Sequence, residues 1–118
     1  MAKPLVGIKV LDLSKVLAGP LCAQYLGDLG AEVIKVEAVG QGDETRGWPP
    51  FPAPDLGAVF LSANRNKRSI AINMKSEKGR ALVHELAKSA DVAIRVLVPA
   101  LPSGWRSTPT AFVPSTAG

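Results

Sequence analysis

The stretch that decides the fold runs from Val10 to Glu37 and reads VLDLSKVLAGPLCAQYLGDLGAEVIKVE. An apolar run over 9–13 has the length and β-branched content of a strand, and a second such run follows over 32–36. Between them we predict a helix with Pro20 in its first turn, where the missing N–H of proline costs no hydrogen bond. A strand, a crossover helix and a second strand in so short a stretch are typical of a parallel βαβ unit.

The helix of this unit has a predicted apolar face and a predicted end. Apolar side chains recur at helical spacing and should pack on the sheet; they are Leu17, Leu21, Cys22, Tyr25, Leu26 and Leu29. Cys22, the single cysteine, is therefore expected to be a small core residue, and there is no disulfide framework. Gly30 is expected just after the last helical residue, where a glycine commonly ends a helix.

The loop of small residues over 14–19 is the first candidate ligand site. In open parallel sheets, ligands bind beyond the carboxyl ends of the strands, beside the N-termini of the following helices. The N–H groups and the positive dipole end found there suit phosphates. The dinucleotide fingerprint G-x-G-x-x-G is missing. The loop therefore indicates either a nucleotide-like ligand or only a compact connection.

The rest of the chain continues the alternation of strands and helices. Residues 38–56 are rich in Gly and Pro, which is typical of a loop. A short helix is expected over 58–63, and strands are expected over 69–73 and 91–94. The order of elements predicts an α/β fold with a Rossmann-like parallel sheet.

A second long helix is predicted between the last two strands. Ser76 offers a side-chain N-cap, and the helix should extend through Ser89. His84, the only histidine, is interpreted as an exposed surface residue of this helix. Its apolar face should consist of Ala81, Leu82, Leu86 and Ala87.

The character of the chain changes at Arg95. Residues 95–118 contain no Asp or Glu, four prolines and many Ser and Thr, and they show neither helical nor strand periodicity. Taken alone, they are typical of a disordered tail. We therefore divide the chain into a Rossmann-like part, residues 1–94, and an irregular tail, residues 95–118.

Composition and charge narrow the class of protein. The chain of 118 residues is 47% hydrophobic and 20% charged, which are values of a globular domain with one small core. The net charge of +4 is not arranged as a basic stripe with interleaved aromatic residues, so we expect no nucleic-acid partner. There is no signal-peptide pattern and no apolar run near the roughly 18 residues of a membrane helix. We expect a cytoplasmic protein without a membrane partner.

Four blocks of sequence resemble the start of a family III CoA-transferase. They are GIKVLDLSKVLAGP from Gly7, DLGAEVIKVE from Asp28, GDETRGW from Gly42 and FLSANRNKRSIAINMK from Phe60. The family includes formyl-CoA transferase, carnitine CoA-transferases and α-methylacyl-CoA racemases, and the resemblance covers residues 7–94. It implies an incomplete N-terminal part of a larger domain, coenzyme A or an acyl-CoA as substrate, no metal, and a family that forms interlocked homodimers.

The resemblance also implies a partial CoA-binding surface. Its residues are Val16, Leu17, Ala18, Ala38, Ile72, Asn73, Met74 and Lys75. The first three would meet the adenine end, and the last four would close round the nucleotide. Lys75 would be a phosphate partner that acts as a point charge. Ala38 stands where the family often has an arginine, so one phosphate contact is lost.

The catalytic residue of the family lies outside this sequence. The resemblance implies an aspartate nucleophile, and its position lies beyond residue 118. None of Asp12, Asp28, Asp43 and Asp91 is at that position, and Asp12 is interpreted as structural. The sequence thus predicts no catalytic residue and an inactive chain. The acyl group and the choice between transferase and racemase stay open, and the alternative is a small non-catalytic nucleotide- or partner-binding module.

Two charged blocks each have two interpretations. Residues 42–48 form either a surface turn with a local ion pair or, as the resemblance implies, a segment near the active-site cleft or the dimer contact. Residues 64–68 form either a phosphate-facing patch or a solvated turn, and the resemblance favours a structured role.

The tail departs from the family pattern near Leu97, where an Arg-Pro-Gly turn and a helix would follow. If each codon takes the last base of one residue and the first two bases of the next, the tail can encode RPGVAERLALDPDGLRAEHRR. That sequence has the Arg-Pro-Gly turn followed by a charged, helix-like stretch. We therefore hypothesise a frameshift near codon 97 and a truncated family member, whose uncovered apolar faces would make it poorly soluble.

Overall fold

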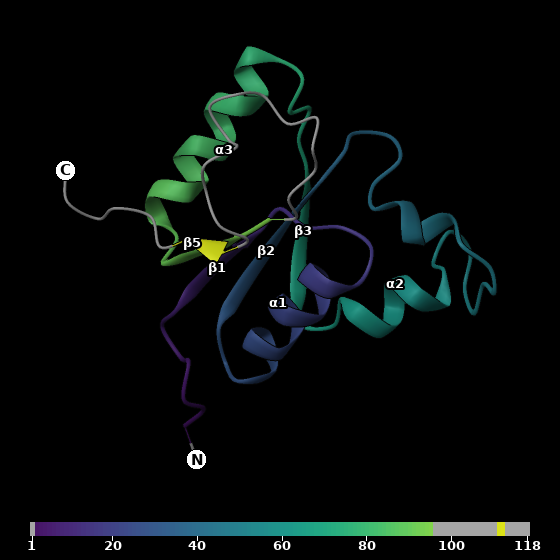
Figure 1. The fold of residues 1–118 in the computed structure, drawn as a ribbon, viewed down its shortest axis with the longest axis horizontal. Coiled ribbons are helices and arrows are strands. Elements are labelled where there is room, and N and C mark those ends of the chain that lie inside the picture. The colour runs from purple at the N-terminus through teal and green to yellow at the C-terminus, as the bar shows by residue number, and fades with distance from the viewer. Residues whose placement is uncertain (1, 96–110, 113–118) are drawn as a thin grey trace.

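A parallel sheet is the centre of the molecule in the computed structural model, which describes residues 2–95 and, for the backbone alone, 111–112. The sheet has the order β3-β2-β1-β4-β5 (Figure 1). Its parallel strands are β1 (Lys9–Asp12), β2 (Glu32–Glu37), β3 (Lys67–Ala71) and β4 (Val92–Ile94). The predicted α/β, Rossmann-like class is confirmed.

A fifth, short strand, β5 (Ala111–Phe112), lies antiparallel to β4. Phe112 pairs with Ala93, and Ala111 pairs with Ile94. These two residues belong to the segment expected to be irregular, and here the structure differs from that expectation. The expectation for residues 96–110 and 113–118 lies outside the described residues.

Helices cover both faces of the sheet. The helices are α1 (Ala18–Asp28), α2 (Ala58–Ala63) and α3 (Glu77–Ser89), with a short 3-10 turn η1 (Glu44–Gly47). Val10 packs in one core cluster with Ala23 of α1, whereas its neighbour Leu11 packs in a second cluster with Val83 of α3. Since successive strand residues point to opposite faces, α1 and α3 lie on opposite sides of the sheet (Figure 1).

The buried face of α1 agrees with the prediction only in part. Leu26 packs against the core as expected, but the fully buried positions are small and polar residues, namely Gly19, Pro20, Ala23, Gln24 and Gly27. Tyr25 is 57% exposed and Cys22 is exposed, so the prediction of Cys22 as a core residue was wrong. Close approach explains the difference, because a Cβ on Gly27 would lie 3.2 Å from the Asn66 carbonyl oxygen. Gly30, with φ +106°, follows the helix as predicted.

The buried face of α3 also differs in part from the prediction. Leu86 packs against the core as expected, but Leu82 is 56% exposed, and Val83 takes the central buried position. The predicted cap is confirmed, because the Ser76 hydroxyl accepts a hydrogen bond from the Gly79 N–H at 3.0 Å. The helix is thus rotated slightly from its predicted orientation, while its boundaries agree.

Candidate functional site

The carboxyl ends of β1, β2 and β3 lie at one edge of the sheet, because these strands are adjacent and parallel. Residues 16–18 follow β1, Ala38 follows β2, and residues 72–75 follow β3. The structure therefore brings all three groups of implied CoA contacts to the same edge. This is also the edge at which open α/β sheets bind ligands.

The first group lies in the loop between β1 and α1. Val16 is half-buried and has a φ of +72°, whereas Leu17 is 45% exposed and Ala18 is exposed. Leu17 precedes α1 without a side-chain capping hydrogen bond. The loop therefore leaves the side chains of Leu17 and Ala18 exposed at the start of α1.

The third group forms a tight turn between β3 and α3. Ile72 is a core residue, and its N–H donates to the Glu37 carbonyl at 2.9 Å, which extends the pairing of β2 with β3. Asn73 Oδ1 accepts a hydrogen bond from the Lys75 N–H at 3.0 Å. The Lys75 side chain is exposed, so its ammonium is accessible to an anionic ligand. Met74 is half-buried against the α3 side of the core.

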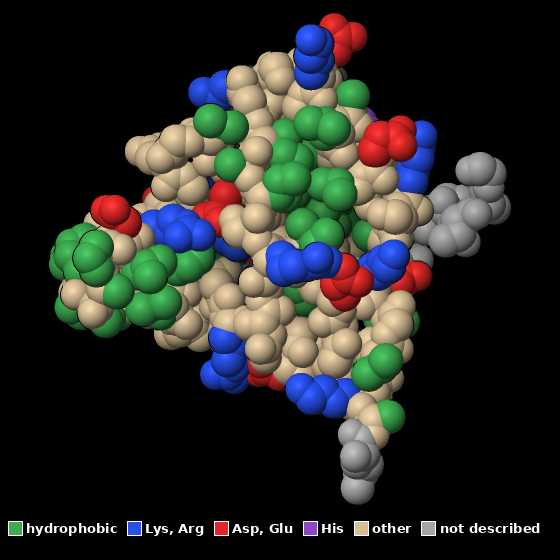
Figure 2. All heavy atoms as spheres, turned by 180° about the vertical axis from the view of Figure 1, so that it is seen from behind, with side chains coloured by type: hydrophobic (Ala, Val, Ile, Leu, Met, Phe, Trp, Pro, Cys, Tyr) green, Lys and Arg blue, Asp and Glu red, His purple; other side chains and the backbone are tan. Residues whose placement is uncertain are grey.

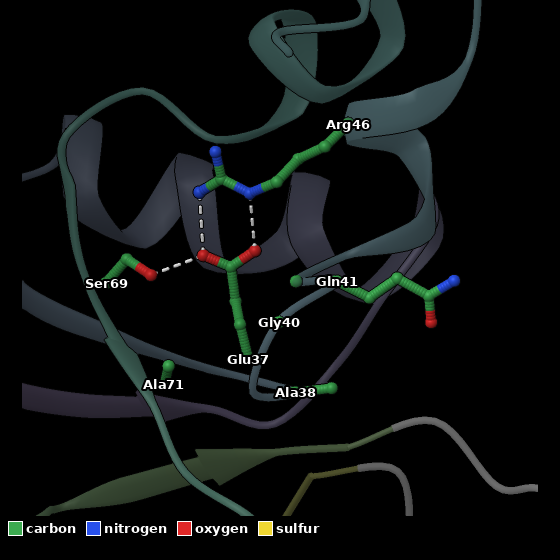
Figure 3. Close-up of a pocket in the computed structure, with 8 residues that line it drawn as sticks. Glu37, Ala38, Gly40, Gln41, Arg46, Ser69 and Ala71 are labelled. Carbon is green, nitrogen blue, oxygen red and sulfur yellow. Dashed lines mark hydrogen bonds and ion pairs between the residues drawn. The ribbon is translucent and has the colours of Figure 1, made fainter.

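A pocket of about 230 Å³ opens beside Ala38 (Figure 3). Its walls are short side chains and one ion pair, contributed by Glu37, Ala38, Gly40, Gln41, Gly42, Arg46, Ser69 and Ala71. Ala38 is the one implied CoA contact among these lining residues. The pocket therefore lies at the predicted edge, but most of its walls come from residues that the sequence did not single out.

Every oxygen of the Glu37 carboxylate has a partner at the wall of this pocket (Figure 3). Arg46 donates two hydrogen bonds of 2.7 Å, and the Asp43 N–H and the Ser69 hydroxyl donate one each. Burial by itself would raise the pKa of Glu37, but these hydrogen bonds outweigh it and lower the pKa to about 2. Glu37 is therefore not available to bind a ribose hydroxyl, the task of the acid at this place in dinucleotide-binding folds.

Residues 42–48 are held in place by contacts with residues outside this segment. Arg46 pairs with Glu37 on β2 at 2.7 Å, and its guanidinium lies 3.9 Å from the centroid of the Phe60 ring. Its carbonyl accepts a hydrogen bond from the Gly57 N–H at 3.0 Å. The interpretation as a surface turn with a local ion pair was wrong, because this segment joins β2 to α2.

Asp12, at the end of β1, is held inside the protein. It is fully buried, and one oxygen accepts hydrogen bonds from the N–H and the hydroxyl of Ser14. The other oxygen lies 2.8 Å from Lys67 Nζ and 3.9 Å from Lys35 Nζ. These contacts agree with the structural role predicted for Asp12.

Lys67 belongs to neither a phosphate-facing patch nor a solvated turn. Its ammonium donates to Asp12 Oδ2, the Pro20 carbonyl and Asn64 Oδ1 at 2.8–2.9 Å. Burial lowers the pKa of Lys67, and Asp12 opposes the shift. Lys67 pairs with Val33 of β2, so β3 begins there, two residues before the predicted start. The structured role that the resemblance favoured for residues 64–68 is confirmed at Lys67.

Sequence reasoning missed the charged and polar residues that build this edge, chiefly Lys35, Glu37, Asp43 and Ser69. A signal for the first two was present, because alternation along β2 places Lys35 and Glu37 on the same face as Val33, which is buried. No local pattern pointed to Asp43 or Ser69, since their partners lie on other elements.

Within the part of the chain that the structure describes, no group of three His, Cys, Asp or Glu side chains could hold a metal ion. In the same residues, every helix is too short or too polar to cross a membrane.

Comparison with known proteins gives one consistent family. The model of CoA-transferase family III matches residues 5–111. The chain is 55% identical over 98 residues to the succinyl-CoA:glutarate CoA-transferase of Homo sapiens, covering 82% of this chain and 22% of that protein. It is 44% identical over 100 residues to the formyl-CoA:oxalate CoA-transferase of Afipia carboxidovorans, covering 84% and 23%.

Solved structures agree with the sequence comparison. A CAIB/BAIF family protein from Brucella suis superposes with a TM-score of 0.75 at 45% identity, covering 80% of this chain and 26% of that one. A hypothetical protein from Mycobacterium tuberculosis gives 0.74 at 45% identity, covering 83% and 26%. The chain thus spans about a quarter of the length of the relatives that it matches. By sequence and by structure, it belongs to CoA-transferase family III.

Proposed function

We propose that this chain is the CoA-facing N-terminal part of an acyl-CoA:carboxylate CoA-transferase or acyl-CoA racemase, and that alone it transfers no CoA. One observation carries the proposal: residues 16–18, Ala38 and residues 72–75 follow three adjacent parallel strands and meet at one edge. The relatives that are named as CoA-transferases act on CoA thioesters. The complete protein would then be a cytoplasmic enzyme and an interlocked homodimer, an assembly that we do not expect this fragment to form.

The proposed surface is partial. Val16, Leu17 and Ala18 would meet the adenine end, and the exposed Lys75 would contact a phosphate. Ala38 lines the pocket with a methyl group and offers no charge. Since Lys75 is the one charged residue among the proposed contacts, we expect weak binding of CoA.

The aspartates weighed as nucleophiles all have structural partners. Asp12 pairs with Lys67, Asp43 with Lys35, and Asp28 with Arg65. Asp91 accepts a hydrogen bond of 2.8 Å from the Lys9 N–H. A carboxylate engaged in this way is a poor nucleophile, which supports the proposal that the catalytic aspartate is missing from this chain.

We further propose that the coding frame changes near codon 97. The test is to resequence the coding DNA from codon 90 to about 200 bases past the stop, together with an intact mass of the expressed protein. We expect that restoring one base opens a frame that begins Arg-Pro-Gly and continues in the family pattern. A downstream sequence without such a frame would show that the short chain is genuine.

CoA binding tests the role of the surface. Calorimetry of the 118-residue chain should show no CoA binding tighter than about 1 mM, and an assay should show no CoA transfer. In the frame-restored protein, Lys75→Ala should weaken CoA binding about tenfold, as expected for one lost charged contact. Lys78→Ala, at an exposed position of α3, is the matched control and should leave affinity unchanged.

The alternative function predicts the opposite result for the short chain. A non-catalytic nucleotide-binding module should bind CoA with micromolar affinity without its family's remaining sequence. Micromolar binding by the 118-residue chain would therefore replace the fragment proposal with the module.

A further inference from the structure

Four buried charges of alternating sign lie beneath the loop between β1 and α1. They are Asp43, Lys35, Asp12 and Lys67, and each side chain is at most 2% exposed. The distances between successive charged atoms are 2.9 Å, 3.9 Å and 2.8 Å. A row of this kind leaves no charge uncompensated in the interior, since each cation lies beside a carboxylate.

The same four side chains hold the main chain of the loop. Lys35 Nζ donates to the Ser14 carbonyl at 3.0 Å, and Lys67 Nζ donates at 2.9 Å to the carbonyl of Pro20 in the first turn of α1. Asp12 Oδ1 accepts from the Ser14 N–H at 2.9 Å. The buried charges therefore hold the start of the loop and the first turn of the helix that follows it.

Asp43 holds the middle of the loop at Val16, whose backbone conformation is unfavourable. Its Oδ1 accepts from the Val16 N–H at 3.4 Å. Val16 has a φ of +72°, a conformation that is rare for a β-branched residue and is maintained only when its surroundings impose it. The Val16 conformation thus depends on contacts from elsewhere in the fold, not on its own preference.

We propose that the row of Asp43, Lys35, Asp12 and Lys67 fixes the loop between β1 and α1 before any ligand arrives, with Lys35 and Asp43 as positioning residues for Val16. The identity of the ligand, the adenine end of CoA, rests on the proposed function. The anchoring itself does not. A loop fixed in advance binds its ligand without the loss of conformational entropy that a mobile loop would suffer.

The test compares two double variants of the 118-residue chain by amide hydrogen exchange. Lys35→Met with Asp43→Ala removes the Lys35–Asp43 ion pair. It also removes the hydrogen bonds that these two side chains make with the Ser14 carbonyl and the Val16 N–H, while Asp12 and Lys67 remain paired. Lys35→Met with Asp43→Asn also removes the ion pair but keeps an oxygen that can accept from Val16. We expect the Val16 amide to exchange at least about tenfold faster in the first variant and to recover much of its protection in the second.

Reference amides separate a local effect from a general loss of stability. The Val33 amide, in the core of β2, should change less than about threefold in both variants. Lys88→Met, which breaks an exposed ion pair with Glu85, is the matched lysine control and should change neither amide. Equal Val16 exchange in all chains, or a rise that Val33 shares, would overturn the proposal.

CoA is tested separately from anchoring. Addition of CoA to the frame-restored protein should slow the hydrogen exchange of the Val16 amide. If CoA binds to that protein without slowing Val16, CoA is not the ligand of the loop, and the proposed function fails while the anchoring stands.

Discussion

At the scale of single residues, Glu37 determines how the pocket edge responds to acid. Its pKa is lowered from 4.5 to about 2, so the folded protein binds a proton there less readily than the unfolded chain. The stabilisation is complete above the unfolded pKa, near 4.5, and is lost as the pH falls through about 2. For a shift of this size it amounts to up to about 3 kcal/mol.

The corresponding prediction concerns Glu37→Gln. At pH 6 the variant should unfold with a free energy lower than that of the wild type, because Arg46 loses its charged partner. The difference should shrink by about 2–3 kcal/mol as the pH falls to 2, since only the wild type then gains a proton at this site. Urea denaturation at several pH values measures it, with Glu85→Gln, in an exposed ion pair, as control. A difference that stays constant with pH would contradict the assignment.

At the scale of elements, the segment between β2 and α2 is built to a fixed shape in spite of its Gly- and Pro-rich sequence. Asp43 caps η1 through the Thr45 N–H at 3.0 Å, and Arg46 joins the segment to β2. Gly57 closes it by close approach, because a Cβ there would lie 2.2 Å from the Thr45 carbonyl oxygen and 2.4 Å from that of Trp48.

Two glycines of this segment give a matched prediction. Gly57→Ala should destabilise the protein by at least about 2 kcal/mol, since two backbone carbonyls would have to move. Gly47→Ala should change stability by less than about 0.5 kcal/mol, because no atom lies within 4 Å of the place that its new methyl group would take. Thermal and urea unfolding compare the two. Equal effects of the two substitutions would show that the Thr45 and Trp48 carbonyls can move away from a methyl group at position 57 with little loss of stability.

Local signals explain which elements the sequence could predict. The βαβ unit, the Ser76 cap and Gly30 depend on residues within a few positions, and all three agree with the structure. The face of α1 was predicted only in part, because hydrophobicity was weighed and close approach was not. The burial of Lys67 at the start of β3 could not be predicted, since its partner Asp12 lies 55 positions away. The charged walls of the pocket depend on equally distant contacts.

At the scale of the whole molecule, large apolar side chains remain at the surface. Leu82 is 56%, Phe51 52%, Ile70 41% and Trp48 39% exposed. Figure 2 shows hydrophobic side chains gathered over the middle of one face and at a projecting end on the α2 side. Contiguous apolar surface of this kind favours association in water.

We therefore predict that the 118-residue chain associates at micromolar concentration. Leu82→Lys should reduce the association, because it places a charge within the apolar surface of α3. Ala81→Lys adds the same charge at the neighbouring exposed position and should have less effect. Light scattering coupled to size exclusion measures the mass of each chain. A monomeric wild type that melts cooperatively would count against the fragment hypothesis.

The buried row of four charges also has a consequence for how this sequence can vary among homologues. Loss of a single member leaves a partner charge without compensation in the interior, which is strongly destabilising, whereas replacement of both partners is often tolerated. Positions 12, 35, 43 and 67 should therefore covary, with Lys35 changing together with Asp43, and Asp12 together with Lys67. Selection would act on these pairs as units, although their members are far apart in the chain.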